Sequence, residues 1–355
     1  MGDTKDLYMI RFNCDYSEGA HPAVLEKLAQ TNLEQTPGYG QDIYCRQAAD
    51  LIKSLCQAPQ AEVHFLTGGT QTNLTVIAAC LRPYQTVLSA DSGHINVHET
   101  GAIEATGHRI LSLPETDGKI TAEQVSHACK EHWLDDNPEF APQPKLVYIS
   151  FPTEYGTLYS KAELSALRRV CDENNLFLFM DGARLGYGLE APGNDLTLAD
   201  IAACCDVFYI GGTKIGALLG EAVVITNPKL QKDFRYFIKQ KGAMLAKGRV
   251  LGLQFLALFE DGLYFKISKH ANDMAQIIRR ACTEAGFPFL YNSTTNQQFP
   301  ILPQALVKRL EEDYAFAHTK RLDRGQMAIR ICTSWATREE DTLQLAADIR
   351  KDAGE

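Results

Sequence analysis

Residues 176–220, LFLFMDGARLGYGLEAPGNDLTLADIAACCDVFYIGGTKIGALLG, decide the fold. The stretch begins with a short apolar run that ends at Asp181, and a second apolar run, DVFYI at 206–210, leads to Lys214. Short, nearly continuous apolar runs are typical of parallel strands that are buried on both faces of a sheet. Ligands of open α/β sheets bind beyond the carboxyl ends of the strands, so we expect Asp181 and Lys214 at one ligand-binding edge.

This pair of charges has a chemical interpretation. A pyridoxal phosphate (PLP) site needs a lysine that forms a Schiff base and a carboxylate that keeps the pyridine nitrogen protonated. The pair alone is also consistent with two solvated side chains at loop ends, because loops of α/β proteins often carry charges. The rest of the chain has to decide between the two interpretations.

Composition narrows the class of protein. The chain has 355 residues, a length that suggests two domains. Its 35 basic and 44 acidic residues give a net charge of −9, which argues against binding to nucleic acid or to an anionic membrane. The ten cysteines form no CxxC pair and suggest reduced thiols. With no signal peptide and no apolar run of about 18 residues, we expect a cytoplasmic protein.

A glycine-rich turn follows the apolar run VHFL at 63–66. It contains Gly69 and Thr70 and leads into the apolar, helix-like segment LTVIAACL. Backbone N–H groups and the helix dipole at such a junction bind phosphate, and glycines permit its close approach. The missing Gly-Lys-Ser/Thr ending excludes a P-loop. An ordinary threonine-rich helix N-terminus explains the turn equally well.

The segment HINVHE at 94–99 contains two histidines and a glutamate, which raises the question of a metal site. The order of these residues differs from the H-E-x-x-H arrangement of zinc sites, and no cysteine ligand lies near them in the sequence. We therefore expect no metal. His94 follows a predicted strand, where a histidine is usually structural, but beside a cofactor its imidazole could stack on a ring.

Alternating strands and helices from about 60 to 226 predict a mostly parallel sheet with helices on both faces. The basic region 239–249, which includes Lys247 and Arg249, could complete a phosphate site from a neighbouring subunit or form a solvated basic face. Beyond it the sequence predicts a smaller α+β domain with strands at FPFL, QFPILP and MAIRICTSW. Arg330, flanked by Ile329 and Ile331, should point away from them, toward solvent or a cleft.

Eight short motifs together give a family resemblance. They are YGQD at 39–42, GGT at 68–70, HINVHETGA at 94–102, TEYGT at 153–157, DGAR at 181–184, GGTK at 211–214, KGR at 247–249 and RICTSW at 330–335. The chain resembles the threonine aldolase branch of the β-eliminating lyase family, which is PLP-dependent and of fold type I. The resemblance implies an N-terminal segment (1–20) associated with the small domain, a large PLP-binding α/β domain (21–245) with a mostly parallel seven-stranded sheet, and a small C-terminal α+β domain (246–355).

The resemblance also implies the cofactor residues. Lys214 would bind PLP as a Schiff base, Asp181 would pair with the pyridine nitrogen, and His94 would stack on the ring. The residues that would bind the phosphate are Gly69 and Thr70, with Arg249 and Lys247 reaching in from the partner of a homodimer or homotetramer. The active site would then lie at a subunit interface.

Substrate residues follow from the same resemblance. Arg184 would lie by the phenolic oxygen of the cofactor and by the substrate, and Arg330 would bind the substrate carboxylate, a bidentate task that suits arginine. Cys14 replaces a family serine that helps to bind this carboxylate. Two further departures, PTEY at 152–155 and TKIGAL at 213–218, leave substrate and stereochemical preference undetermined.

The implied function is an aldolase, a carbon–carbon lyase. It would cleave L-threonine, L-allo-threonine or related β-hydroxy-α-amino acids such as phenylserine to glycine and an aldehyde. The base for the β-hydroxyl proton could be His94, a water, Glu154 or His98. A β-eliminating lyase or an aminotransferase acting on another amino acid is the alternative, because fold type I carries all of these reactions. A non-catalytic binding protein of this fold is less consistent with the sequence, because Lys214, Asp181, the GGT turn and both arginines are all present.

Overall fold

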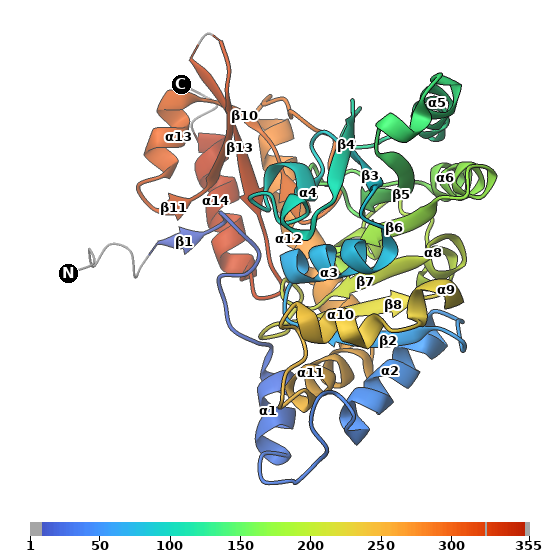
Figure 1. Cartoon of the computed structure of the whole chain (residues 1–355). Helices are drawn as coiled ribbons and strands as arrows, with labels where there is room; N and C mark the ends of the chain where they lie inside the picture. Colours follow the sequence, from blue (N-terminus) through green and yellow to red (C-terminus); the bar gives the residue numbers. More distant parts are fainter. Residues whose placement is uncertain (1–8, 324, 352–355) are drawn as a thin grey trace.

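In the computed structural model, which describes residues 9–323 and 325–351, a seven-stranded sheet forms the centre of the protein (Figure 1). Its strands are β2 (Glu62–Leu66), β3 (Gln85–Ala90), β4 (Arg109–Leu113), β5 (Gln143–Ser150), β6 (Phe177–Asp181), β7 (Val207–Gly211) and β8 (Glu221–Ile225). Their order is β2-β8-β7-β6-β5-β3-β4, and β8 runs antiparallel to both of its neighbours while the other pairs are parallel. The predicted mostly parallel sheet of fold type I is confirmed.

Helices cover both faces of this sheet (Figure 1). One face is covered by α1 (Pro22–Gln30), α2 (Ile43–Leu55), α5 (Ala122–Leu134), α6 (Lys161–Glu173), α8 (Leu198–Cys204) and α11 (Arg249–Phe259). The other face is covered by α3 (Gly69–Cys80), α4 (His94–Val97), α9 (Pro228–Gln231) and α10 (Phe234–Gln240). The short helix α7 (Leu185–Leu189) follows β6, and the 3₁₀ turns η2 (Glu104–Thr106) and η3 (Pro138–Phe140) lie in connections.

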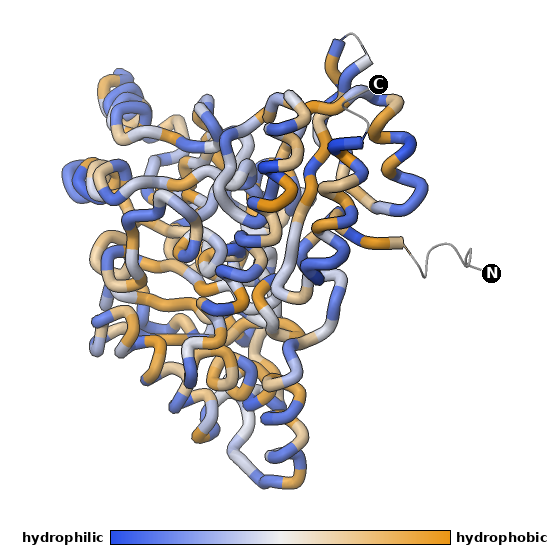
Figure 2. Tube along the Cα trace, turned by 180° about the vertical axis from the view of Figure 1, so that it is seen from behind, coloured by the Kyte–Doolittle hydropathy of each residue, from blue (hydrophilic) through white to orange (hydrophobic). Residues whose placement is uncertain are grey.

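The apolar runs have the burial that the sequence predicts. Leu178 and Met180 of β6 pack into the core on one face, and Phe179 between them packs into the core on the other. In Figure 2, hydrophobic (orange) stretches run through the middle of the trace, and hydrophilic (blue) stretches are frequent at its periphery. Helix α6 begins with a capping box, in which Ser160 and Glu163 satisfy each other's backbone N–H groups.

A smaller α+β part follows (Figure 1). It consists of α12 (Leu263–Glu284), β9 (Gln297–Gln298), β10 (Ile301–Pro303), α13 (Gln304–Leu310), β11 (Tyr314–Ala315), β12 (Ala317–Arg321), β13 (Gln326–Cys332) and α14 (Glu339–Lys351). Strand β13 pairs antiparallel with β10, β12 and β9. The strand predicted at FPFL is wrong, since only an isolated bridge forms between Phe289 and Pro300. Pro288 has no N–H to donate to a ladder.

The N-terminal segment lies on this smaller part. Strand β1 (Ile10–Arg11) pairs in parallel with β11, and the remainder of the expected 1–20 segment before residue 9 lies outside the described residues. Phe255 of α11 and Tyr264 of α12, which follow the expected domain boundary at 245/246, pack in the core of the larger part. The position of that boundary stays a prediction. Among the described residues, no helix combines the length and apolar character needed to cross a bilayer.

Candidate active site

The site lies at one edge of the sheet, where several strands end. Strand β6 ends at Asp181, which is in register with Ser150 at the end of β5. Strand β7 ends at Gly211, just before Lys214. Because β8 runs in the opposite direction, its first residue, Glu221, lies at the same edge and in register with Gly211. The sheet topology therefore gathers the two residues predicted from the sequence, Asp181 and Lys214, at one edge.

Four donors hold the buried carboxylate of Asp181. Oδ1 accepts hydrogen bonds from the Tyr209 hydroxyl at 2.5 Å and from the Ala183 N–H at 3.0 Å. Oδ2 accepts from the Tyr148 hydroxyl at 2.6 Å and from Asn73 Nδ2 at 3.0 Å. Burial alone would raise the pKa of Asp181, but the charge of His94 and the hydroxyl donors outweigh it and hold the pKa below its usual value. Asp181 is thus a fixed anion.

A hydrogen-bonded chain connects this anion to His94. Asn73 Nδ2 also donates to Glu99 Oε1 at 2.7 Å, and the same oxygen lies 2.8 Å from His94 Nδ1. Burial lowers the pKa of His94, but the hydrogen bond to Glu99 and the charges of Asp181 and Glu99 raise it above its usual value. The imidazole is therefore oriented through Nδ1, and its Nε2 is left for a ligand.

Glu154 supports the other side of His94. Its Oε1 accepts the His94 backbone N–H at 2.9 Å and the Ser150 hydroxyl at 2.7 Å. Burial raises the pKa of Glu154 against the effect of the Ser150 hydrogen bond, and the charge of Asp181 raises it further. Glu154, which stands in the PTEY departure from the family pattern, thus holds the turn that carries His94.

Lys214 has a fixed main chain and a partly buried side chain. Its carbonyl accepts a hydrogen bond from the Tyr187 hydroxyl at 2.6 Å. Burial lowers the pKa of Lys214, and the positive charge of Arg184 lowers it further, while Asp15 and Asp181 act in the opposite direction. A lysine whose neutral form is favoured is a better nucleophile toward a carbonyl group.

Arg184 lies within this charged group but is already paired. Its Nε and Nη2 donate to the two oxygens of Asp15, at 2.7 and 3.0 Å. Asn296 Nδ2 donates to Asp15 at 2.9 Å, and Asp15 is fully buried. The ion pair raises the pKa of Arg184 despite its burial. Only one edge of the guanidinium is occupied in this bidentate geometry, so Nη1 can face a ligand.

Of the other predicted substrate residues, Cys14 belongs to the N-terminal segment and Arg330 contacts it. Arg330 alternates with the buried Ile329 and Ile331, as predicted, and its Nη2 donates to the Asn13 carbonyl at 3.0 Å. Arg330 Nε is buried and has no hydrogen-bond partner among residues 9–323 and 325–351. Cys14 is partly buried, and its Sγ lies 3.2 Å from the Ser17 hydroxyl. An unpaired guanidinium N–H is the donor that a carboxylate ligand would use.

The glycine-rich turn fits an anion. Helix α3 starts at Gly69, and its N-cap, Gly68, makes no side-chain cap; no acidic residue lies in the first turn. The first backbone N–H groups are therefore left for a ligand. A Cβ on Gly69 would lie 3.3 Å from the Tyr209 hydroxyl, so a larger residue would crowd the turn against the donors of Asp181. Thr70, in the first turn of this helix, is exposed.

The residues expected to come from a partner subunit lie elsewhere on this chain. Lys247 is exposed, and the guanidinium of Arg249 donates to the carbonyls of Glu34, at 2.7 Å, and Thr31, at 2.5 Å. It also lies over the ring of Tyr44, 5.3 Å from the ring centroid. These contacts turn Arg249 toward the loop between α1 and α2 of its own chain.

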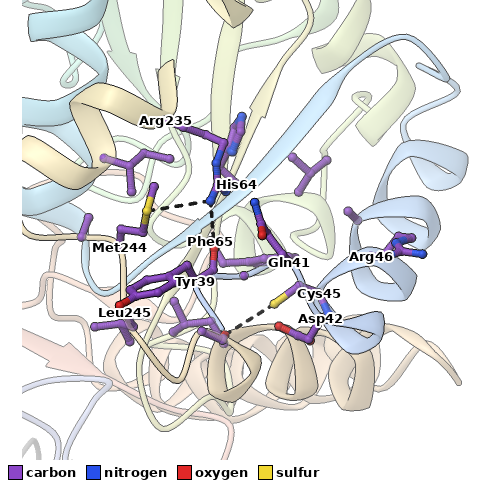
Figure 3. A pocket seen from close by; sticks show the side chains of 17 residues that line it. Tyr39, Gln41, Asp42, Cys45, Arg46, His64, Phe65, Arg235, Met244 and Leu245 are labelled. Carbon is purple, nitrogen blue, oxygen red and sulfur yellow. Dashed lines mark hydrogen bonds between the residues drawn. The ribbon is translucent and has the colours of Figure 1, made fainter. Parts of the chain in front are cut away.

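A pocket of about 340 Å³ lies between β2, the start of α2 and residues 243–248 (Figure 3). Arg235 spans it and donates to the Tyr39 carbonyl at 3.1 Å, and Met244 lies beside it (Figure 3). Lys214 and Asp181 are not among its lining residues. The YGQD motif therefore lines this pocket and not the charged edge of the sheet.

Sequence reasoning missed several residues that shape the site. Tyr148 and Tyr209 lie inside apolar strands, where a tyrosine signals only a buried ring, and Asn73 lies inside the apolar helix after the glycine turn. A polar residue in such a helix was the available signal. Among the described residues, no group of three or more His, Cys, Asp or Glu side chains is arranged to hold a metal ion.

Comparisons with known proteins agree with this architecture. The sequence model of the family described as beta-eliminating lyase matches residues 13–305. The low specificity L-threonine aldolases of Pseudomonas sp. and Pseudomonas aeruginosa are 30% and 28% identical, over 96% of this chain and 97% of each relative. A solved structure of Leishmania major threonine aldolase is 44% identical, covers 97% of this chain and 99% of its own, and superposes with a TM-score of 0.94.

Proposed function

The chain belongs to the β-eliminating lyase family, and from this premise we propose that it is a PLP-dependent aldolase. It would cleave L-threonine, L-allo-threonine or related β-hydroxy-α-amino acids, such as phenylserine, to glycine and an aldehyde. The observation that carries the proposal is that Lys214, with its lowered pKa, and Asp181, with its four hydrogen-bond donors, lie at the same edge of the sheet. The names of the full-length relatives support the choice of reaction.

The residues present fit PLP. When bound, this cofactor supplies an electron sink for cleavage of a bond at the substrate Cα. Lys214 would hold it covalently, and the anion of Asp181 would keep the proton on its pyridine nitrogen. The uncapped start of α3 at Gly69 and Thr70 would bind the phosphate. His94 would present its ring to the pyridine from the network through Glu99.

The substrate would be held by two arginines. Arg330 offers an unpaired Nε for the carboxylate, and Cys14 lies beside the Asn13 carbonyl that already binds Arg330 Nη2. Arg184, fixed by Asp15, would present its remaining N–H groups to the cofactor oxygen and to the substrate. Two cations around one carboxylate orient it in a single way, which is a requirement for cleaving one chosen bond.

Of the candidate bases, His98 has the most support. Glu154 is occupied by the His94 N–H and Ser150, and the raised pKa of His94 favours its protonated form, which cannot accept a proton. Burial, the neighbouring His94, and the charges of the two arginines and of Lys214 all lower the pKa of His98. It is therefore neutral at pH 7 and able to take the β-hydroxyl proton.

We further propose a homodimer or homotetramer with the site at a subunit interface. Leu33, with 93% of its surface exposed, lies in the α1–α2 loop that Arg249 contacts. Tyr236, which is 76% exposed, lies on α10, just before the basic region 239–249 in the sequence. Exposed apolar groups beside a basic segment are consistent with a subunit contact. Lys247 and Arg249 would then serve the phosphate site of the partner. All ten cysteines are free, which supports a reducing compartment such as the cytoplasm.

Product identity tests the function. The full chain, loaded with PLP, would be incubated with L-threonine, L-allo-threonine and L-phenylserine, and glycine, aldehyde, ammonia and keto acid would be quantified. Glycine with an equal amount of aldehyde is expected. Ammonia and keto acid without glycine would assign a β-elimination instead, and loss of the reaction from Lys214→Ala must accompany either result.

A further inference from the structure

Glu221 is a buried carboxyl group that the proposed reaction does not yet use. It is 3% exposed and is the first residue of β8. It is in register with Gly211, at the end of the strand that leads to Lys214, and with Leu66, at the end of the strand that leads to the glycine turn. Glu221 therefore lies between the segment that carries the lysine and the segment expected to bind the phosphate.

Its carboxylate holds the turn that carries Lys214. Oε2 accepts the Gly212 N–H at 3.0 Å, and Oε1 accepts the Thr213 hydroxyl at 2.8 Å. The same hydroxyl accepts the Gly220 N–H at 2.9 Å, which closes the base of the turn. Both carboxylate oxygens of Glu221 thus accept hydrogen bonds from the two residues immediately before Lys214.

The turn has little room to move away from these contacts. A Cβ on Gly212 would lie 2.7 Å from the Gly220 carbonyl oxygen and 2.9 Å from the Phe255 ring. On the other side, the carbonyl of Lys214 is held by the Tyr187 hydroxyl. The main chain of Lys214 is therefore fixed from both directions, and its side chain is the part left free to reach a ligand.

The charge of Glu221 acts on the lysine as well. Burial raises the pKa of Glu221 to about 8, against the effects of the Thr213 hydrogen bond and of Lys214. In return, the negative charge of Glu221 opposes the effect of burial on the pKa of Lys214. The Glu221 carboxyl is therefore mostly neutral at pH 7 and becomes negative as the pH rises through about 8, where its charge favours a proton on the lysine.

We infer that Glu221 is a positioning residue for Lys214: it fixes the turn that carries the lysine and, when ionised, supplies a negative charge that favours a proton on the lysine nitrogen. This inference rests on the proposed function in so far as Lys214 binds PLP. It assigns to Glu221 an electrostatic task in addition to holding the turn.

The test separates charge from shape. Glu221→Gln keeps the side-chain length and one acceptor but removes the charge. The full chain, loaded with PLP, would be titrated with pH while the visible absorbance of the lysine-bound cofactor is followed. Removing a nearby negative charge should move the midpoint to lower pH, by on the order of one pH unit.

Two other variants serve as controls. Asp206→Asn removes a buried carboxylate that binds Arg168 and Asn227 at the opposite edge of the same sheet. It should lower stability and leave the midpoint in place. Thr213→Val removes the hydroxyl that binds Glu221 and Gly220 but keeps the carboxyl of Glu221. It should weaken PLP retention without moving the midpoint to lower pH.

The outcomes are distinct. A folded Glu221→Gln protein with the wild-type midpoint overturns the inference, as does a shift of the same size in Asp206→Asn. If Glu221→Gln does not fold, Glu221→Asp replaces it: this variant keeps the charge on a shorter arm and should retain the midpoint while releasing PLP faster, and a shifted midpoint would contradict us. A wild-type protein without any visible absorbance would instead refute the proposed PLP function.

Discussion

The buried ion pair between Asp15 and Arg184 allows a quantitative prediction. Asp15 is fully buried, and it accepts two hydrogen bonds from Arg184 and one from Asn296. Burial would raise the pKa of Asp15, but the charges of Arg184 and Lys214 and these hydrogen bonds lower it from 3.8 to about 2. The perturbation is Asp15→Asn, which preserves the shape of the side chain and removes its charge.

The size of the effect follows from this pKa. A shift of nearly two units corresponds to about 2 kcal/mol in favour of the ionised, folded form. Because the folded pKa lies below the unfolded value, this contribution is complete above pH 3.8 and is lost as the pH falls through about 2. Leaving the buried charge of Arg184 without a partner adds to the loss, so we expect Asp15→Asn to cost about 3–5 kcal/mol at pH 7.

Urea unfolding at pH 7 and at pH 3 measures the free energy of unfolding, and we expect the same m-value for wild type and Asp15→Asn. The difference between wild type and Asp15→Asn should be smaller at pH 3, since about half of the ionisation contribution remains there. The matched control is Asp273→Asn. Its pair with Lys269 has the same 2.7 Å separation, but both side chains are more than half exposed, so we expect a loss of only about 0.3–0.5 kcal/mol.

The double variant Asp15→Asn/Arg184→Met isolates the cause. It removes both charges, so the penalty for a buried, unpaired guanidinium disappears and part of the lost stability should return. If Asp15→Asn loses no more than Asp273→Asn, or if the double variant is less stable than Asp15→Asn, the pair does not carry the energy assigned to it.

Three further changes test the site. Tyr148→Phe removes a hydroxyl donor to Asp181, so it should raise the pKa of that carboxyl, cost about 1.5–3 kcal/mol in urea unfolding, and weaken PLP binding in a titration; unchanged PLP affinity would contradict the role of Asp181. Gly69→Ala adds a Cβ 3.3 Å from the Tyr209 hydroxyl, so the affinity for PLP should fall about tenfold or more. The melting temperature should stay the same or rise, because alanine favours a helix more than glycine does. Arg330→Lys loses the planar fork and should raise the KM for threonine about tenfold or more with a smaller change in kcat, and an effect on kcat alone would remove Arg330 from substrate binding.

The sequence was sufficient for the positions of the two main chemical groups. The apolar run before Asp181 is a buried strand that ends at this residue, and the run before Lys214 is its neighbour in the sheet. Both conclusions depend on local patterns, namely run length and the place of a charge at the end of the run. The alternation of Arg330 with two buried isoleucines is local in the same sense.

The remaining features depend on contacts between distant segments. Asp15 meets Arg184 because β1 pairs with β11 and brings the N-terminal segment to the site, which no local pattern reveals. Tyr148 and Tyr209 reach Asp181 because their strands flank β6 in the sheet. Glu221 reaches the edge only because β8 is antiparallel, whereas alternating strands and helices predict parallel strands.

The charges at this edge also bear on the subunit arrangement. Asp15 pairs with Arg184, and Asp15, Asp181 and Glu221 all act on Lys214 against the effect of burial on its pKa, so these acidic groups already interact with cations of their own chain. PLP adds a phosphate, and residues 67–73 of the glycine turn contain no basic side chain. The first backbone N–H groups of α3 supply only partial positive charge. A basic side chain from outside this turn would stabilise the phosphate, and the exposed Lys247 and the nearby Arg249 of a second copy are the residues that we propose for that task. The need for a basic side chain therefore supports the proposed sharing of the site between subunits, in addition to family resemblance.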